Sequence, residues 1–153
     1  MKTTSLAPTT LHDYFGSVEL DEGGKSYRAA LTFSSSHTIS VAIDWAGISP
    51  AEALRRSQDI CEQVRIREPE YRDAVARKLL PLYNESWGNG EVIEMDGFMR
   101  RISLAEIRVS PVDFGTPCCA VLYYCADGGL FAGHSIEVFL DGDFHYDNSQ
   151  LAG

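Results

Sequence analysis

The last third of this sequence contains no basic residues. Between Val109 and Gly153 the chain carries six acidic residues and neither lysine nor arginine. The formal net charge of the whole chain is −9, so two thirds of it belongs to this stretch. A strongly acidic surface repels phosphate backbones, which argues against direct binding of nucleic acids. We expect the stretch to meet a basic protein partner, with improved solubility as the plainer explanation. Its acidic residues are Asp113, Asp127, Glu137, Asp141, Asp143 and Asp147.

The sequence also lacks the signals of a membrane or secreted protein. No apolar run approaches the ~20 residues that span a bilayer. The start of the chain shows no basic run followed by an apolar stretch of roughly 7–15 residues, as a signal peptide would. We therefore expect a soluble, cytoplasmic protein without membrane contact. A length of 153 residues and a hydrophobic content of 44% fit one domain over 1–153, with residues 1–11 as a loose terminal segment.

Recognised metal, cofactor and nucleophile motifs are missing as well. The four cysteines form neither a CxxC pair nor a zinc-type cluster, which favours reduced, structural thiols. A nucleophilic Cys118, Cys119 or Cys125 partnered by His134 would need an electropositive surrounding, and this region has no basic residue to supply one. The glycines at 88, 90, 128 and 129 complete no dinucleotide or phosphate-binding motif, so we expect turns and no cofactor.

Alternating patterns predict strands in the first fifty residues. Apolar residues recur at every second position from Tyr27 to Phe33 and again from Ile39 to Trp45. A shorter alternating run around Val18 precedes them and ends at a glycine-containing turn signal. The pattern predicts a three-stranded antiparallel meander.

A helical period follows the meander. Ser49-Pro50-Ala51-Glu52 combines a capping serine, proline at the first helical position and a glutamate three residues after the cap. The residue before a proline is disfavoured in the helical conformation, so Pro69 predicts that this helix ends near Arg67 and that a second one begins. We expect two consecutive helices packed on one face of the sheet.

The C-terminal half predicts further strands of the same antiparallel sheet. Residues 102–109 fit either a strand or a short helical turn. Residues 118–126 are apolar throughout, which is typical of a central strand covered on both faces. A further strand runs from Gly133 to Leu140 and enters a hairpin turn at Asp141-Gly142. The fold class is therefore α+β.

A two-residue turn at Asp141-Gly142 would bring together a candidate catalytic cluster. With Leu140 opposite Asp143, the residues His134, His145 and Asp147 share one face, with Asp127 nearby. A histidine beside a carboxylate can act as a general base, and two imidazoles with an aspartate can bind a metal ion. The sequence shows no catalytic motif around them, and a histidine within a strand is more often structural. We therefore assign no catalytic or metal-binding residue.

The stretch Asp127-Gly128-Gly129-Leu130-Phe131-Ala132-Gly133-His134-Ser135-Ile136 resembles a C-terminal D-G-x-L-F-x-G-H-x-I strand found in an uncharacterised family of bacterial domains. The opening His12-Asp13-Tyr14-Phe15-Gly16 is similar to the start of a neighbouring bacterial group. Related small domains occur among the immunity proteins of bacterial toxin systems and have no established enzymatic activity. The resemblance marks Asp127, Gly133 and His134 as signature positions of unknown role and transfers no catalytic residue.

These observations lead to one main functional hypothesis and two alternatives. The main hypothesis is a non-enzymatic cytoplasmic protein-binding domain, an immunity-type inhibitor that covers a basic partner such as a toxin. One alternative is a small hydrolase or metal-dependent enzyme centred on the histidine cluster. The other is a structural module whose exposed sheet aromatics make a homodimer. In the main hypothesis, the partner contacts come from Asp141, Asp143, Asp147, Phe139, Phe144 and Tyr146.

Overall fold

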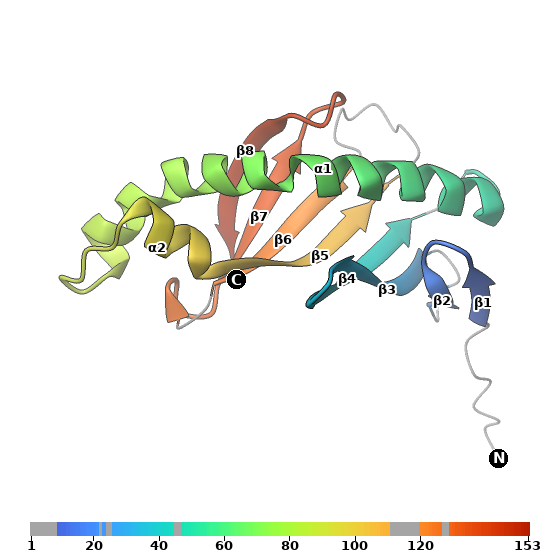
Figure 1. The fold of residues 1–153 in the computed structure, drawn as a ribbon, viewed down its shortest axis with the longest axis horizontal. Helices are drawn as coiled ribbons and strands as arrows, with labels where there is room; N and C mark the ends of the chain where they lie inside the picture. The colour runs from blue at the N-terminus through green and yellow to red at the C-terminus, as the bar shows by residue number, and fades with distance from the viewer. Residues whose placement is uncertain (1–8, 22, 24–25, 45–46, 111–119, 127–128) are drawn as a thin grey trace, which may run out of the picture.

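Eight strands form one sheet, and their order across the sheet is their order along the chain (Figure 1). The computed structural model describes residues 9–21, 23, 26–44, 47–110, 120–126 and 129–153. All neighbouring strands pair antiparallel except β4 and β5, which run parallel. The strands are β1 (Thr9–His12), β2 (Gly16–Leu20), β3 (Ser26–Ser34), β4 (His37–Asp44), β5 (Ile102–Val109), β6 (Ala120–Ala126), β7 (Ser135–Leu140) and β8 (Tyr146–Ala152).

The predicted N-terminal meander is present as β2, β3 and β4. Its side chains alternate as expected, with Val18, Ala29 and Val41 aligned across the three strands and buried. One further strand precedes it, because β1 pairs with β2 from Thr9 to His12. The expected loose segment through residue 11 therefore extends too far, and residues 1–8 lie outside the described part. Trp45, at the end of the second alternating run, also lies outside it.

One long helix crosses the sheet where two were predicted. Helix α1 runs from Pro50 to Leu82 without interruption and connects the parallel strands β4 and β5 through η1 (Tyr83–Trp87) and α2 (Met95–Arg100). Pro69 lies inside it, at a cost of about 3 kcal/mol relative to alanine. Buried residues continue on both sides of this proline, including Val64 and Tyr71. Packing against the sheet therefore outweighs the local preference to end the helix.

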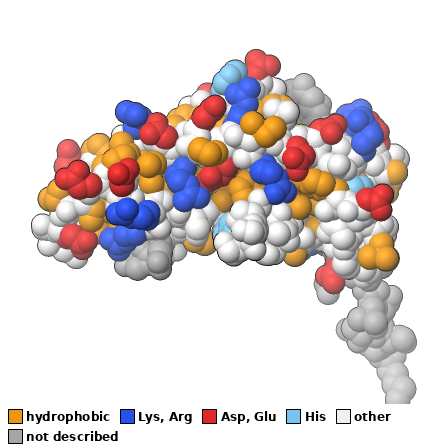
Figure 2. All heavy atoms as spheres, in the orientation of Figure 1, with side chains coloured by type: hydrophobic (Ala, Val, Ile, Leu, Met, Phe, Trp, Pro, Cys, Tyr) orange, Lys and Arg blue, Asp and Glu red, His pale blue; other side chains and the backbone are white. Residues whose placement is uncertain are grey.

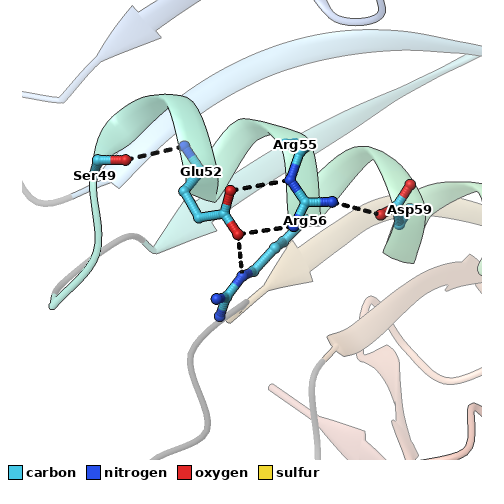
Figure 3. Close-up of polar contacts among 5 residues, drawn as sticks. All are labelled: Ser49, Glu52, Arg55, Arg56 and Asp59. Atoms are coloured by element: carbon cyan, nitrogen blue, oxygen red, sulfur yellow. Dashed lines mark hydrogen bonds and ion pairs between the residues drawn. The ribbon is translucent and has the colours of Figure 1, made fainter.

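The predicted start of α1 is confirmed in detail. The Ser49 hydroxyl accepts a hydrogen bond from the Glu52 backbone N–H at 3.2 Å (Figure 3). The Glu52 carboxylate in turn accepts from Arg55 at 2.8 Å and from Arg56 at 2.8 Å. These hydrogen bonds, that from Arg55 first, lower the pKa of Glu52 to about 2. Capping and charge pairing fix the helix where the chain leaves the meander.

The core lies between α1 and one face of the sheet. Its largest fully buried side chains include Tyr71 of α1, Tyr124 of β6, Phe98 of α2 and Phe131. We call the opposite side of the sheet the open face; the residues aligned across it include Arg28, Ala42, Arg108, Val121 and Phe139. None of the described helices is long and apolar enough to cross a membrane.

Strands β5 and β6 settle two expectations. Residues 102–109 form a strand, so the helical alternative is wrong there. Strand β6 was expected to be covered on both faces, but its buried residues, Ala120, Leu122 and Tyr124, lie on one face, while Tyr123 is half-buried and Cys125 is exposed on the open face. No described helix or strand covers that side of β6. The cysteines at 118 and 119 lie outside the described residues.

Candidate functional site

The β7–β8 hairpin closes through a five-residue loop rather than the predicted two-residue turn. Leu140 pairs with Tyr146, and residues 141–145 form the connection. The Asp141 carboxylate accepts the backbone N–H groups of Asp143 and His145, each at 2.9 Å. Phe144 adopts a positive φ of 64°. The aspartate side chain thus organises a longer loop, which a turn prediction from two residues does not capture.

The corrected register separates the candidate catalytic residues. His134 precedes β7, whereas His145 lies in the loop at the other end of that strand. The partners of Ile136 and Val138 are Leu151 and Ser149, not Asp147 and His145. Within the described ranges, no group of three or more His, Cys, Asp or Glu residues could hold a metal ion. Asp127 lies outside them. The predicted cluster therefore depends on a register that is wrong.

The signature block around His134 is a packed turn. The His134 Nδ1 lies 2.8 Å from the Phe131 carbonyl oxygen, so Nδ1 carries the proton and donates it. Gly133 provides a positive φ of 84° beside it. The Phe131 ring makes edge contacts with Tyr83, Trp87 and Phe98, with centroids 5.6–6.1 Å apart. The block thus fastens the start of β7 to η1 and α2.

Cys61 has the environment of the structural thiol that was expected from the sequence. This side chain is fully buried in α1, and burial raises its pKa to about 12. Such a thiol is inert at neutral pH. Cys125 is exposed on the open face, so the expectation of buried thiols is wrong for this residue.

The hairpin loop and the start of β8 present the predicted acidic residues. Asp143 and Asp147 are exposed, and 41% of the Asp141 side chain is accessible. The pKa of Asp141 is lowered, first by the backbone N–H of His145 and also by that of Asp143. The His145 Nδ1 lies 3.5 Å from the Asp141 carboxylate. We call Asp141, Asp143 and Asp147 the acidic tip.

The hairpin that carries the acidic tip is held against helix α1 through residues next to the tip. The Tyr71 hydroxyl donates to the Phe144 carbonyl oxygen at 2.6 Å, which supports the strained residue of the loop. The Lys78 ammonium donates to the Asn148 side chain and to the Ser149 carbonyl oxygen. Acidic and basic side chains are interspersed over the side of the molecule on which α1 lies, and a histidine lies beside an acidic side chain at the top of the view (Figure 2). The loop is therefore preorganised by contacts with the helix.

The three predicted aromatic anchors do not share a surface. Phe139 lies on the open face, where it pairs with Asn148. Tyr146 pairs with Leu140 on the helix side, and its hydroxyl lies 2.6 Å from the Ser149 hydroxyl. Phe144 packs against the core. All three are half-buried.

A hollow over β2, β3 and β4 was not foreseen from the sequence. It has a volume of about 500 Å³. Glu19 and Arg28 stand opposite each other across two of these strands, and small residues leave space beside them. Ala30 of β3 and Ser40 of β4 are small residues that pair with each other. They are the sequence signal from which this hollow could have been predicted. The lining comprises Ser17, Glu19, Arg28, Ala29, Ala30, Thr38, Ile39 and Ser40.

Comparison with known proteins gives a family and no closer relative. No curated protein and no solved structure matches the chain. A family model described as "Uncharacterized protein conserved in bacteria (DUF2262)" matches residues 12–150. This range takes in strands β2 to β7, most of β8 and all the described helices. The chain therefore belongs to the DUF2262 family of proteins conserved in bacteria.

Proposed function

We propose that this chain is a non-enzymatic cytoplasmic protein-binding domain that uses its acidic tip against a basic surface of another protein. In this proposal it acts as an immunity-type inhibitor, with a toxin as the partner. The observation that carries the proposal is the preorganised hairpin end, free of lysine and arginine, that presents Asp141 and Asp143 in the loop and Asp147 at the start of β8.

Electrostatics supports this use of the tip. Charged groups across an interface speed the encounter and select the orientation of the partner. The lowered pKa of Asp141 means that this carboxylate stays ionised to a lower pH than an ordinary aspartate. The described residues from Ala120 onward include no lysine or arginine that could neutralise the tip from its own strands. Of the predicted anchors, Phe139 offers an apolar contact on the open face beside it.

The fixed geometry of the hairpin loop also supports the proposal. A loop that is already fixed loses little conformational entropy when it binds. Hydrogen bonds hold three backbone groups of the loop. The Tyr71 hydroxyl binds the Phe144 carbonyl oxygen, and the Asp141 carboxylate binds the N–H groups of Asp143 and His145. The negative charge is therefore displayed in a defined geometry rather than on a flexible tail.

The test is co-expression with the protein encoded by the neighbouring gene. We expect protection of growth if that protein is toxic, and a complex whose affinity falls as salt is raised. Reversing all three charges, with Asp141→Lys, Asp143→Lys and Asp147→Lys, should slow association at low salt by about tenfold or more.

A matched control separates local from overall charge. Glu85→Lys, Glu91→Lys and Glu94→Lys change the net charge by the same amount at exposed positions near α2. We expect this control to bind nearly as fast as the unchanged protein. Equal slowing in both triple variants, or binding that salt leaves unchanged, would contradict the proposal.

A further inference from the structure

The two edges of the sheet differ in how they are protected. An edge strand exposes unpaired backbone N–H and C=O groups, and proteins guard such edges with charges, bulges or covering side chains. In the described part of the chain, the sheet ends at β1 on one side and at β8 on the other (Figure 1).

The β8 edge is guarded. Lys78 reaches over from α1, and its ammonium donates to the Ser149 carbonyl oxygen at 2.5 Å and to the Asn148 side chain. The pairing of β7 with β8 is irregular between Phe139 and Leu140, where Asp147 is the extra residue. A bulge, a lysine and an exposed carboxylate all discourage another strand from pairing there.

Among the described residues, the β1 edge shows none of these devices. Its sequence, Thr-Thr-Leu-His, holds no Asp, Glu, Lys or Arg, and its pairing with β2 is regular. Leu11 is 86% exposed, the most exposed of the large hydrophobic side chains in the described residues. β-Branched and apolar residues without charge favour pairing with another strand.

We propose that β1 pairs antiparallel with β1 of a second copy, which joins two sheets into one continuous sheet. We assign a second copy as the occupant, because the uncharged edge lets two acidic chains meet away from their most acidic strands. Two thirds of the net charge of −9 lies in the stretch that contains β7 and β8, at the other end of the sheet. Pairing through the uncharged strand keeps these acidic regions as far apart as the fold allows. A twofold axis also places threonine and leucine side chains of the two copies side by side.

The shortness of strand β1 limits the strength of the dimer contact. Four residues on each side bury much less than the roughly 800 Å² per partner of a standard interface. The dimer is therefore reversible and depends on concentration. It displays two acidic tips facing away from each other, and its existence does not depend on the function proposed for them.

The experiment is sedimentation velocity of the full chain over a roughly hundredfold range of concentration. We expect a shift from monomer to dimer that Leu11→Lys or Thr10→Lys abolishes, because each places a charge on the edge strand. Both positions are exposed, so the variants should fold, and circular dichroism during melting checks this.

Two control variants make the result specific. Ile66→Lys places the same charge at a hydrophobic residue of α1 that is 69% exposed, and it should leave the dimer intact. Phe139→Lys tests a dimer through the open face and should also leave it intact. A monomer at every concentration, or a dimer lost through Phe139→Lys but not through Leu11→Lys, would overturn the proposal.

Discussion

Two arginine–carboxylate clusters on helix α1 use the same chemistry in different surroundings. In the first, Glu52 pairs with Arg55 and Arg56, whose side chains are 62% and 44% exposed. In the second, Glu68 pairs with Arg72 at 2.8 Å, and the Glu68 side chain is only 11% exposed. The first cluster lies at the start of the helix in water, and the second lies between the helix and the sheet.

The second cluster connects helix α1 to three other elements of the fold. Glu68 accepts from the Tyr124 hydroxyl of β6 at 3.0 Å. Arg72 donates to the carbonyl oxygens of Met99 and Ile102, at 3.1 and 2.9 Å, where α2 meets β5. An exposed pair gains little because water screens it, whereas a buried charge that loses its partner is strongly unfavourable. The comparison predicts that similar substitutions have very different costs in the two clusters.

The largest effect is expected for Arg72→Met. This change leaves the Glu68 carboxylate without its counter-ion and two carbonyl oxygens without their donor, at a cost of about 3 kcal/mol in unfolding free energy. Urea denaturation measures it. Arg55→Met is the matched control and should cost much less. Equal losses in the two variants would show that burial does not distinguish the clusters.

A smaller effect is expected for Tyr124→Phe. The ring stays buried, but Glu68 loses one hydrogen bond, which costs about 1–2 kcal/mol. Burial, first, and the Glu68 charge raise the pKa of Tyr124, so its hydroxyl remains a donor throughout the accessible pH range. Denaturant melts of Tyr123→Phe, a half-buried neighbour on the open face, provide the comparison. A larger loss for Tyr123→Phe would contradict this account.

A gain in stability is expected for Ser57→Ala, between the two clusters. The Ser57 side chain is fully buried, and its hydroxyl has no hydrogen-bond partner among the described residues. Removing an unsatisfied hydroxyl and adding the better helix former should stabilise the protein by roughly 1 kcal/mol. Thermal and urea melts measure the gain. A destabilised variant would mean that Ser57 is satisfied in solution.

The smallest effect is expected for Glu52→Gln. The pKa of Glu52 falls from its ordinary 4.5 to about 2 in the folded chain. A lowered carboxyl pKa adds stability above pH ~4.5, and this stability is lost as pH falls from there toward 2. The variant should therefore melt slightly below the unchanged protein at pH 7 and at nearly the same temperature at pH 2. A difference in melting temperature that grows as pH falls would contradict the stabilising role of the Glu52 carboxylate.

Much of the fold could be predicted because local patterns determine it. Alternation identifies β3 and β4, and the Ser49 cap locates the start of α1. The continuation of α1 through Pro69 could not be predicted, because tertiary packing of residues such as Tyr71 decides it. The parallel pairing of β4 with β5 leaves no local signal either, since its partners are far apart in sequence.

The candidate site was less accessible to prediction. The acidic tip follows from composition, and the structure presents Asp143 and Asp147 to solvent. The grouping of the histidines and of the aromatic residues failed with the hairpin register. A side-chain acceptor, Asp141, lengthens the loop, and a shift of one position moves a side chain to the other face of a sheet.

The parallel pairing of β4 with β5, which we call the parallel seam, also affects how the chain folds. The strands before and after it are antiparallel neighbours in chain order, so each set can pair through short connections. The seam pairs Val41 with Ile107, and all of α1, η1 and α2 lie between these two residues in the sequence. Closing so long a segment costs entropy before any contact repays it. We therefore expect closure of this seam to limit the folding rate, with the long helix as the element that brings its two sides together.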